Sequence, residues 1–321
     1  MRAIYVEQAN PSSPLDALVV GERPEPKAPE GWARVRVRAA SVNHHDVWSL
    51  RGVGLPPERM PMILGTDAAG VTEDGREVIV HAVIASDGWE GDETLDPKRT
   101  LLSELHQGTF AEWVVVPERN LVDKPEWLSW EEASCLPTAW LTAYRMLTRD
   151  SGLSSPGTVL VQGASGSVAS AAIALAKALG HRVWATARTP EKRDFALSLG
   201  ADAAFEPGAR LPERVDCVIE TVGEATWAHS LRALRPGGTV VVCGATSGPN
   251  PPADLARVFF LQLRIIGSTM GTREELVALL DLLDASGVRP HIDRVLPLGD
   301  AGEALAAMAA GEQLGNLVLR P

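Results

Sequence analysis

Short apolar runs alternate with amphipathic stretches through the centre of the chain. From residue 129 to 268 the apolar runs are TVLVQ (158–162), HRVWATA (181–187), VDCVIE (215–220), GTVVVCG (238–244) and LRIIGS (263–268). Runs of this length that are rich in valine and isoleucine are typical of strands buried on both faces, and the stretches between them have helical periodicity. The pattern predicts an α/β fold with a right-handed, doubly wound parallel sheet.

The flanking segments have a different pattern. Residues 1–128 contain short β-like runs separated by loops with Pro and Gly, including RVRVRAASVN (34–43), REVIVHAVI (76–84) and FAEWVVVP (110–117). They predict a compact, β-barrel-like domain. After Thr272 we expect a helix (273–287), a strand (293–298), a second helix (301–310) and a final strand (316–320).

The stretch from Thr158 to Arg188 is the most informative part of the chain. A buried strand leads into a loop of small residues, and an apolar helix follows from Val168 to Leu179. The loop lets the backbone approach a pyrophosphate, which the helix N-terminal amides can bind. The loop and the first residue of the helix are Gly163, Ala164, Ser165, Gly166, Ser167 and Val168. Ala164-x-Gly166-x-x-Ala169 fits the dinucleotide-binding spacing loosely, and the alternative is that these small residues only allow close packing.

The end of the second strand favours NADP(H) over NAD(H). An NAD site usually has Asp or Glu there to accept from the ribose 2′-hydroxyl, whereas this chain has Ala187 followed by Arg188. Arg188 can bind a 2′-phosphate, with Lys192 as a second cation. The alternative is a solvated arginine before a helix that Thr189 caps.

Charge and composition exclude several classes of function. The 321 residues carry a net charge of −11, so nucleic acid and anionic membranes are disfavoured as partners. We expect a cytoplasmic protein, because residues 1–20 lack a signal-peptide pattern and no apolar run is long enough to span a membrane. The three cysteines are far apart in sequence and are expected to be buried apolar residues.

Several segments together resemble the medium-chain dehydrogenase/reductase superfamily, specifically its zinc-free quinone oxidoreductase branch. The matching runs, in order, are ASVNHHDVWSLRG, PMILGTDAAG, GTFAEWVVVP, CLPTAWLTAYRML, TVLVQGASGSVASAAIALAKALG, LRPGGTVVVCGA, LRIIGSTM and LGNLVL. The resemblance covers essentially the whole chain. It implies a GroES-like catalytic domain (1–128, completed by 269–321) and a Rossmann NADP-binding domain (129–268). It also implies a homodimer in which the edge strand LRIIGS pairs with its two-fold mate.

The resemblance implies that no metal is bound. Zinc-dependent relatives have ligands at the places of Asn43, Thr66 and Thr138, and amide and hydroxyl groups do not replace thiolate and imidazole in a tight tetrahedral site. The interval from Val80 to Gly108, where the structural zinc lobe falls in relatives, contains no cysteine. One alternative is a residual metal site formed from His44, His45, Asp67 and His81.

The same resemblance places candidate catalytic residues in SVNHHD. Asn43 and Asp46 lie where the family lines its active site, and Asn43 can donate to a substrate oxygen. His45 matches the hydroxyl residue of a proton relay and is the candidate proton donor, since its pKa suits neutral pH. The alternative for His44 and His45 is a surface histidine beside a histidine satisfied within a turn.

Cofactor contacts beyond the small-residue loop also follow from the resemblance. Some occupy the carboxyl ends of strands, where ligands of such sheets bind. The expected residues are His44, Thr138, Thr142, Thr221, Val222, Gly223, Gly244, Ala245, Thr246, Ser268, Thr269, Met270 and Asn316. Each hydroxyl among them can instead be an ordinary helix cap.

Three functions remain open. The first is an NADPH-dependent reductase that transfers hydride to a small molecule, a quinone or an α,β-unsaturated carbonyl compound, whose electrophilic carbon needs no Lewis acid. The second is a reductase of enoyl thioesters. The third is a crystallin-like protein that binds the cofactor with little catalysis.

Overall fold

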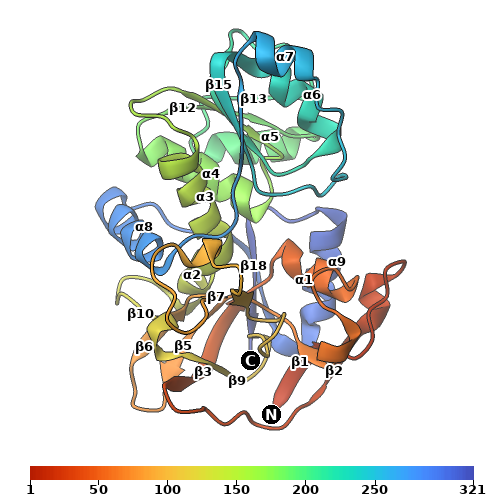
Figure 1. Ribbon diagram of the computed structural model, residues 1–321, viewed down its shortest axis with the longest axis vertical. Helices are drawn as coiled ribbons and strands as arrows, with labels where there is room; N and C mark the ends of the chain where they lie inside the picture. Colours follow the sequence, from red (N-terminus) through yellow and green to blue (C-terminus); the bar gives the residue numbers. More distant parts are fainter. The chain divides into compact units, whose positions relative to one another are not determined.

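The computed structural model describes residues 1–321, which form two compact units (Figure 1). The first unit comprises Met1–Ala139, Met270–Ala278 and Pro290–Pro321, and the second comprises Trp140–Thr269 and Leu279–Arg289. No helix in either unit is long and apolar enough to cross a membrane.

The first unit is mainly β-structure. Its strands are β1 (Arg2–Val6), β2 (Leu18–Glu22), β3 (Trp32–Ser41), β4 (Met62–Ile63), β5 (Ala68–Thr72), β6 (Glu77–Val80), β7 (Val83–Ile84), β8 (Thr100–Leu101), β9 (Trp113–Pro117), β10 (Leu121–Asp123), β17 (Ile292–Pro297) and β18 (Asn316–Arg320). Its helices are α1 (His44–Leu50), α2 (Trp130–Ser134) and α9 (Ala301–Ala310), and α8 (Arg273–Ser286) has residues in both units. Short helical turns are η1 (Pro14–Ala17), η2 (Pro57–Arg59), η3 (Glu93–Leu95), η4 (Glu118–Asn120), η5 (Leu136–Trp140) and η7 (Leu298–Asp300).

Strands from the N-terminal and C-terminal parts of the chain, β3 and β18, meet in one sheet of this unit. Its strand order is β10-β6-β5-β3-β18-β17, and β9 also pairs with β3. The last strand, β18, runs antiparallel to β3 and parallel to β17, with Val318 opposite Ser41. The β-rich character expected for this part of the chain is confirmed, as are the two helices and two strands expected after Thr272.

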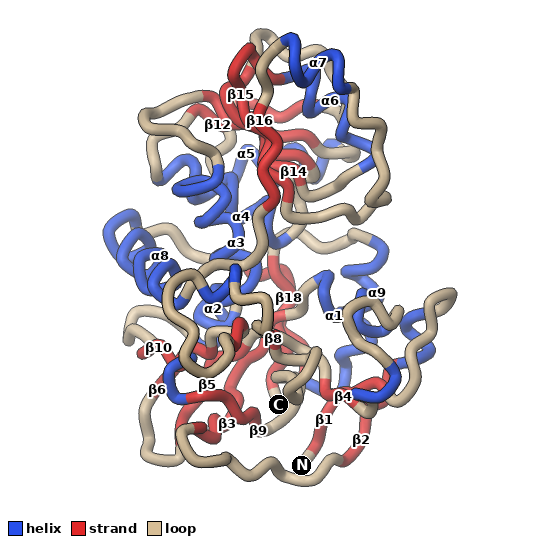
Figure 2. Tube along the Cα trace, viewed as in Figure 1, coloured by secondary structure: helices blue, strands red, loops and turns tan.

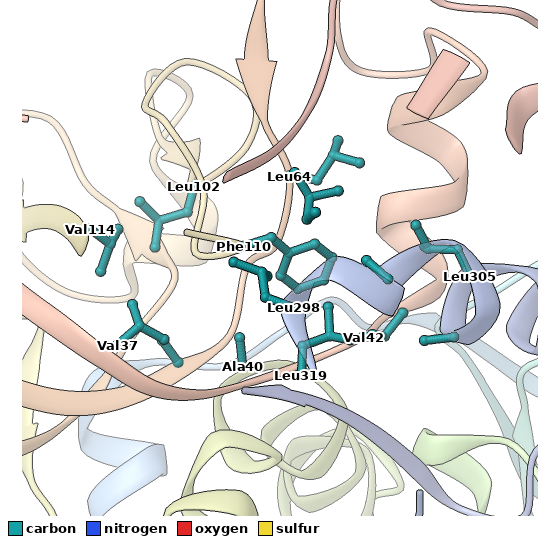
Figure 3. Close-up of a cluster of buried hydrophobic side chains, with 14 of the residues drawn as sticks. Val37, Ala40, Val42, Leu64, Leu102, Phe110, Val114, Leu298, Leu305 and Leu319 are labelled. Carbon is teal, nitrogen blue, oxygen red and sulfur yellow. The ribbon is translucent and has the colours of Figure 1, made fainter. Parts of the chain in front are cut away.

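Phe110 lies at the centre of the apolar core of the first unit (Figure 3). Side chains from distant parts of the sequence surround it, including Leu64, Leu102, Leu298 and Leu319. The C-terminal segment therefore contributes to the same core as the N-terminal strands, and burial of these apolar surfaces stabilises the unit.

The second unit contains a six-stranded parallel sheet of order β13-β12-β11-β14-β15-β16, with its strands red in Figure 2. This is the Rossmann order, so the predicted doubly wound sheet is confirmed. The strands are β11 (Thr158–Gln162), β12 (Arg182–Thr186), β13 (Ala203–Phe205), β14 (Val215–Glu220), β15 (Leu234–Val242) and β16 (Arg264–Gly267). The helical segments are α3 (Leu141–Arg145), η6 (Met146–Asp150), α4 (Ser167–Ala178), α5 (Pro190–Ser198), α6 (Glu224–Ala233) and α7 (Leu255–Phe260).

Two details differ from the sequence-based expectation. Strand β13 was not expected, because its three residues AAF lie partly exposed at a sheet edge and carry no buried apolar pattern. Cys135 and Cys217 are buried as predicted, whereas Cys243 is partly exposed just after β15. All three cysteines are free thiols.

Candidate functional site

The dinucleotide-binding candidates lie at the carboxyl ends of the parallel strands of the second unit. The loop after β11 begins with Gly163, whose φ of +73° favours glycine, and a Cβ there would lie 2.8 Å from Val222 Cγ2. Gly166 is the N-cap of α4, and no side chain caps that helix. Open space surrounds the position where a Gly166 Cβ would stand, and its nearest neighbour is the Gly163 carbonyl oxygen at 3.9 Å. Backbone amides at this helix terminus can therefore bind an anion.

The loops after β14 and β15 approach the β11 loop closely. Thr221 Oγ1 donates to the Gln162 carbonyl oxygen over 3.2 Å, and a Cβ on Gly244 would lie 2.8 Å from the Thr221 carbonyl oxygen. A Cβ on Gly223 would lie 2.5 Å from the Gly248 carbonyl oxygen. Three of the expected segments thus lie together at the carboxyl ends of the central strands: Gly163–Val168, Thr221–Gly223 and Gly244–Thr246.

Glu220 fixes the loop after β14. This role was not predicted from the sequence. Its buried carboxylate accepts from the backbone amides of Val222 (2.9 Å) and Gly223 (3.1 Å). It also accepts from the hydroxyls of Thr226 (2.7 Å) and Ser230 (2.5 Å). The only sequence signal for this role is an acidic residue at the end of an otherwise buried strand.

Arg188 is exposed at the end of β12, and the preceding Ala187 is buried. Thr189 caps α5 by accepting from the Lys192 backbone amide, so the cap proposed as the alternative role of this segment is present. This cap does not use the Arg188 guanidinium. Arg193 lies nearby and donates to the carbonyl oxygens of Ala187 (3.1 Å) and Arg188 (3.4 Å), which fixes the turn.

Ser268 follows β16, and its buried hydroxyl has no hydrogen-bond partner in the protein. A buried donor without a partner is costly, so a ligand that pairs with it is favoured. Thr269 is exposed, and Met270 is buried with a φ of +51°. Together with the uncapped α4 and the glycine turn, the Ser268 hydroxyl makes the carboxyl ends of these strands fit a dinucleotide, whereas Met270 packs against Ala82 and Val83 of the first unit.

Asn43 and Asp46 lie in the first unit, where the chain passes from β3 into α1. The Asp46 carboxylate is fully buried and accepts from the backbone amides of Asn43 (2.8 Å) and Gly65 (3.1 Å). Burial raises the pKa of Asp46 to about 6, against the His45 charge and these two hydrogen bonds. Asp46 thus forms a capping box with Asn43, the N-cap of α1, and fixes the turn that precedes Thr66.

His45 pairs with Glu104 through Nε2 and Oε1 at 3.1 Å. Burial by itself lowers the pKa of His45, but the hydrogen bond to Glu104 and the charges of Asp46, Glu104 and Asp67 outweigh it and raise the pKa. The neighbouring His44 packs edge-on against Trp48, and burial followed by the Arg51 charge lowers its pKa. The Glu104 partner lies in a loop 59 positions away and was not predictable from the sequence.

The Asp67 carboxylate links three residues that are far apart in sequence. Its Oδ2 accepts from Ser41 Oγ at 2.7 Å and from Asn43 Nδ2 at 2.8 Å, and its Oδ1 accepts from Thr138 Oγ1 at 2.5 Å. Thr66 Oγ1 lies 3.3 Å from Asn43 Nδ2 and 3.0 Å from Thr138 Oγ1. The three positions that match zinc ligands in relatives, Asn43, Thr66 and Thr138, therefore belong to one hydrogen-bonded cluster.

These residues do not fit a zinc ion. The Asn43 amide and the Thr138 hydroxyl direct hydrogen atoms at Asp67, and neither group is a thiolate or imidazole. Cys135 donates its thiol to the Glu131 carbonyl oxygen, and burial, with Asp67 among the contributing charges, raises its pKa well above the ordinary value. No group of three His, Cys, Asp or Glu residues in the chain has the geometry of a metal site.

Asn316 is engaged elsewhere, and Thr142 is buried. Asn316 begins β18 and donates its side-chain amide to the His291 carbonyl oxygen at 2.9 Å. Thr142 lies buried on α3 in the second unit. His81, one of the alternative metal ligands, instead pairs with Glu93 at 3.0 Å.

Family models match both parts of the chain. Residues 29–126 match the model described as alcohol dehydrogenase GroES-like domain, and residues 167–285 match zinc-binding dehydrogenase. The chain is 30% identical to a quinone oxidoreductase of Pseudomonas aeruginosa, with 90% of each sequence covered. It is 29% identical to a crotonyl-CoA carboxylase/reductase of Cereibacter sphaeroides, covering 89% of this chain and 79% of that protein.

Solved structures agree with these sequence matches. An NAD-dependent alcohol dehydrogenase superposes with a TM-score of 0.93 at 33% identity over the whole of both chains. The 2-octenoyl-CoA carboxylase reductase CinF, in complex with NADP and 2-octenoyl-CoA, gives a TM-score of 0.89 at 26% identity, covering 99% of this chain and 87% of that one. The chain belongs to the medium-chain dehydrogenase/reductase superfamily and is an oxidoreductase, so the predicted family, fold class and enzyme class are confirmed.

Proposed function

We propose that this protein is an NADPH-dependent reductase that acts, without a catalytic metal ion, on a quinone or an α,β-unsaturated carbonyl compound. The observation that carries the proposal is the cluster of Asn43, Thr66 and Thr138 around Asp67, because an amide and two hydroxyls stand where zinc-dependent relatives have ligands. An acceptor that already has an electrophilic carbon needs no Lewis acid.

The cofactor is NADP(H), which when bound supplies a hydride ion to the electrophilic carbon of the acceptor. The glycine turn at Gly163 and the uncapped N-terminus of α4 would hold its pyrophosphate. Arg188 would pair with the 2′-phosphate. Ala187 carries no carboxylate that would bind the ribose 2′-hydroxyl of NAD and repel that phosphate. The NADP complex of the relative CinF supports the same cofactor.

Side chains of the first unit provide the polar groups for the acceptor. Thr138 is a partly exposed hydroxyl of the Asp67 cluster, whereas Asn43, the predicted donor to the substrate oxygen, is buried and its amide already donates to Asp67 and Thr66. A hydrogen-bond donor that a buried partner already holds in place needs little reorganisation. It can therefore stabilise the negative charge that develops on a carbonyl oxygen. His45, the candidate proton donor from the sequence, stays a prediction, and Glu104 favours its charged form.

A second candidate function is the reduction of an enoyl thioester. It is favoured by the crotonyl-CoA carboxylase/reductase and CinF relatives, whose names specify enoyl-CoA chemistry. The two functions share hydride addition to a carbon–carbon double bond conjugated with a carbonyl group. They differ in whether the protein also binds a phosphorylated thioester carrier.

The test is NADPH oxidation by chelator-treated, metal-analysed protein, with benzoquinone, a short enal and crotonyl-CoA as separate acceptors. We expect turnover of at least one acceptor at less than stoichiometric zinc. Preference for crotonyl-CoA would select the second candidate. Stoichiometric zinc with activity lost on chelation would contradict the metal-free mechanism, and NADPH binding without turnover of any acceptor would indicate the crystallin-like role.

The cytoplasmic location and the domain limits at residues 128 and 269 stay predictions.

A further inference from the structure

Asp67 is a buried carboxyl group without a cationic partner. It is fully buried, and no Lys or Arg forms an ion pair with it. Its hydrogen bonds come from a serine, an asparagine and a threonine, all of them neutral. A buried carboxylate without a counter-ion is costly, and the protonated form relieves that cost. Burial, with the Asp46 charge adding to it, raises the pKa of Asp67 to about 7 against the three hydrogen bonds.

One of these three bonds connects the buried carboxyl to a partly exposed group. Ser41 and Asn43 are buried, whereas Thr138 is partly exposed. The Thr138 hydroxyl lies 2.5 Å from Asp67 Oδ1 and 3.0 Å from the Thr66 hydroxyl. While Asp67 is ionised, the Thr138 hydroxyl donates to its Oδ1. Once Asp67 is protonated the bond reverses, so the hydroxyl accepts from the carboxyl and can give its own proton to a group outside the cluster. No other route of hydrogen bonds leads from Asp67 to an exposed side chain.

We propose that Asp67 is the proton reservoir of the reduction and that the Thr138 hydroxyl passes its proton to the substrate oxygen. The inference rests on the proposed function and deepens it. Thr138 is the catalytic residue, because it contacts the reacting oxygen, and Asp67 acts through it as a positioning residue.

The proton and electron balance closes within the proposed reaction. Hydride addition reduces the acceptor and oxidises the nicotinamide, and the electron pair displaced from the double bond comes to rest on the carbonyl oxygen. That oxygen forms a new O–H bond as the Thr138 O–H bond breaks. Thr138 in turn takes the proton of Asp67, whose carboxylate the Ser41 hydroxyl and the Asn43 amide stabilise. Water returns the proton to Asp67 by the same route after product release.

Three other titratable groups face Asp67 and must be separated from it. On α1, Asp46 is held by the backbone amides of Asn43 and Gly65, and His45 pairs with Glu104. After α2, the Cys135 thiol donates to the Glu131 carbonyl oxygen. Each interacts with Asp67 through charge, and none shares a hydrogen bond with its carboxyl group.

The first test measures protonation without turnover. Infrared difference spectra of the cofactor-free protein, titrated between pH 5 and 9, should show the carbonyl band of a protonated carboxyl that disappears as pH rises through about 7. The band should be absent in Asp67→Asn. A spectrum in which no band in this range is lost in Asp67→Asn would overturn the proposal, whether or not the protein reduces any acceptor.

The second test substitutes Thr138, so it does not depend on whether the Asp67→Asn variant folds. Thr138→Val replaces the hydroxyl with a methyl group of similar size and should lower kcat about 100-fold, the typical share of a positioned proton donor. Thr138→Ser restores the hydroxyl and should recover most of that loss. The kcat of the unmodified protein should fall as pH rises above about 7, because the reservoir empties, and this dependence should be absent in Thr138→Val.

The matched control is Thr109→Val. The Thr109 hydroxyl is also buried and donates to the Asp67 backbone carbonyl oxygen at 2.8 Å, so its loss perturbs the same residue without touching the carboxyl group. It should lower thermal stability and leave the pH profile in place. If Thr138→Val and Thr109→Val have the same pH profile and kcat, the relay is wrong. If the unmodified protein reduces no acceptor while the infrared band behaves as expected, the proposed function fails and the protonated Asp67 stands.

Discussion

At the scale of single residues, Arg188 is the predicted ligand of the cofactor 2′-phosphate, and the structure leaves its side chain available for that role. The side chain is exposed, and the α5 cap is made by Thr189 without it. Nothing local requires an arginine at this position. A role in binding the 2′-phosphate explains the residue type, since a guanidinium fork matches the geometry of a phosphate.

Arg188→Ala should raise the Kd of NADPH by about 10- to 100-fold, the usual worth of a hydrogen bond between charged groups. The Kd of NADH should change little, because NADH lacks the phosphate. Fluorescence titration with both nucleotides measures the two values. Arg210→Ala, which removes another exposed arginine of the same unit, is the control for net charge. Equal losses for NADPH and NADH would contradict the assignment.

At the scale of elements, the turn between β4 and β5 positions the Asp67 cluster. Gly65 has a φ of +92°, and its backbone amide donates to Asp46 at 3.1 Å. A Cβ at this position would lie 2.4 Å from Phe110 Cδ1 and 2.5 Å from Thr109 Oγ1. The turn therefore connects the cap of α1, the apolar core and the residues that follow it, Thr66 and Asp67.

Gly65→Ala should destabilise the protein by about 2–4 kcal/mol, because a strained backbone angle adds to overpacking against Phe110. Thermal or denaturant unfolding measures the change. Gly75→Ala is a matched control, since Gly75 has a similar φ of +91° and its added Cβ would meet nothing within 4 Å. A loss for Gly65→Ala no larger than for Gly75→Ala would show that the packing against Phe110 is not the cause.

At the scale of the whole molecule, β16 is the free edge of the second sheet, since it pairs only with β15. Ile265 on this strand is 43% exposed, and Phe259 and Phe260 on α7 are 72% and 79% exposed. An open, apolar edge invites pairing with another strand. We predict a homodimer in which two copies of β16 pair.

Light scattering on the purified protein should give twice the mass of one chain at micromolar concentration. Ile265→Lys places a charge on the exposed edge and should shift the distribution toward monomer. Val295→Lys is the control, because Val295 is similarly exposed, at 41%, on a strand of the first unit. A monomeric unmodified protein, or equal effects of the two substitutions, would rule out this interface.

The sequence determined the type and order of the elements because their signals are local. Apolar periodicity and helix caps act over a few residues, so the strands of the second sheet and the helix 167–178 were predictable. The glycine turn at Gly163 and the Thr189 cap were predictable for the same reason. The short edge strand β13 was not, because three partly exposed residues carry no such signal.

Only the tertiary structure decided which polar side chains act together. Asp67 receives hydrogen bonds from residues 26, 24 and 71 positions away, and His45 meets Glu104 across 59 positions. Such contacts depend on how strands and turns are brought together, and the burial that sets the pKa of Asp67 exists only once the core has formed around it. The residues that make this site were present in the sequence, but their partners and their protonation were decided by folding.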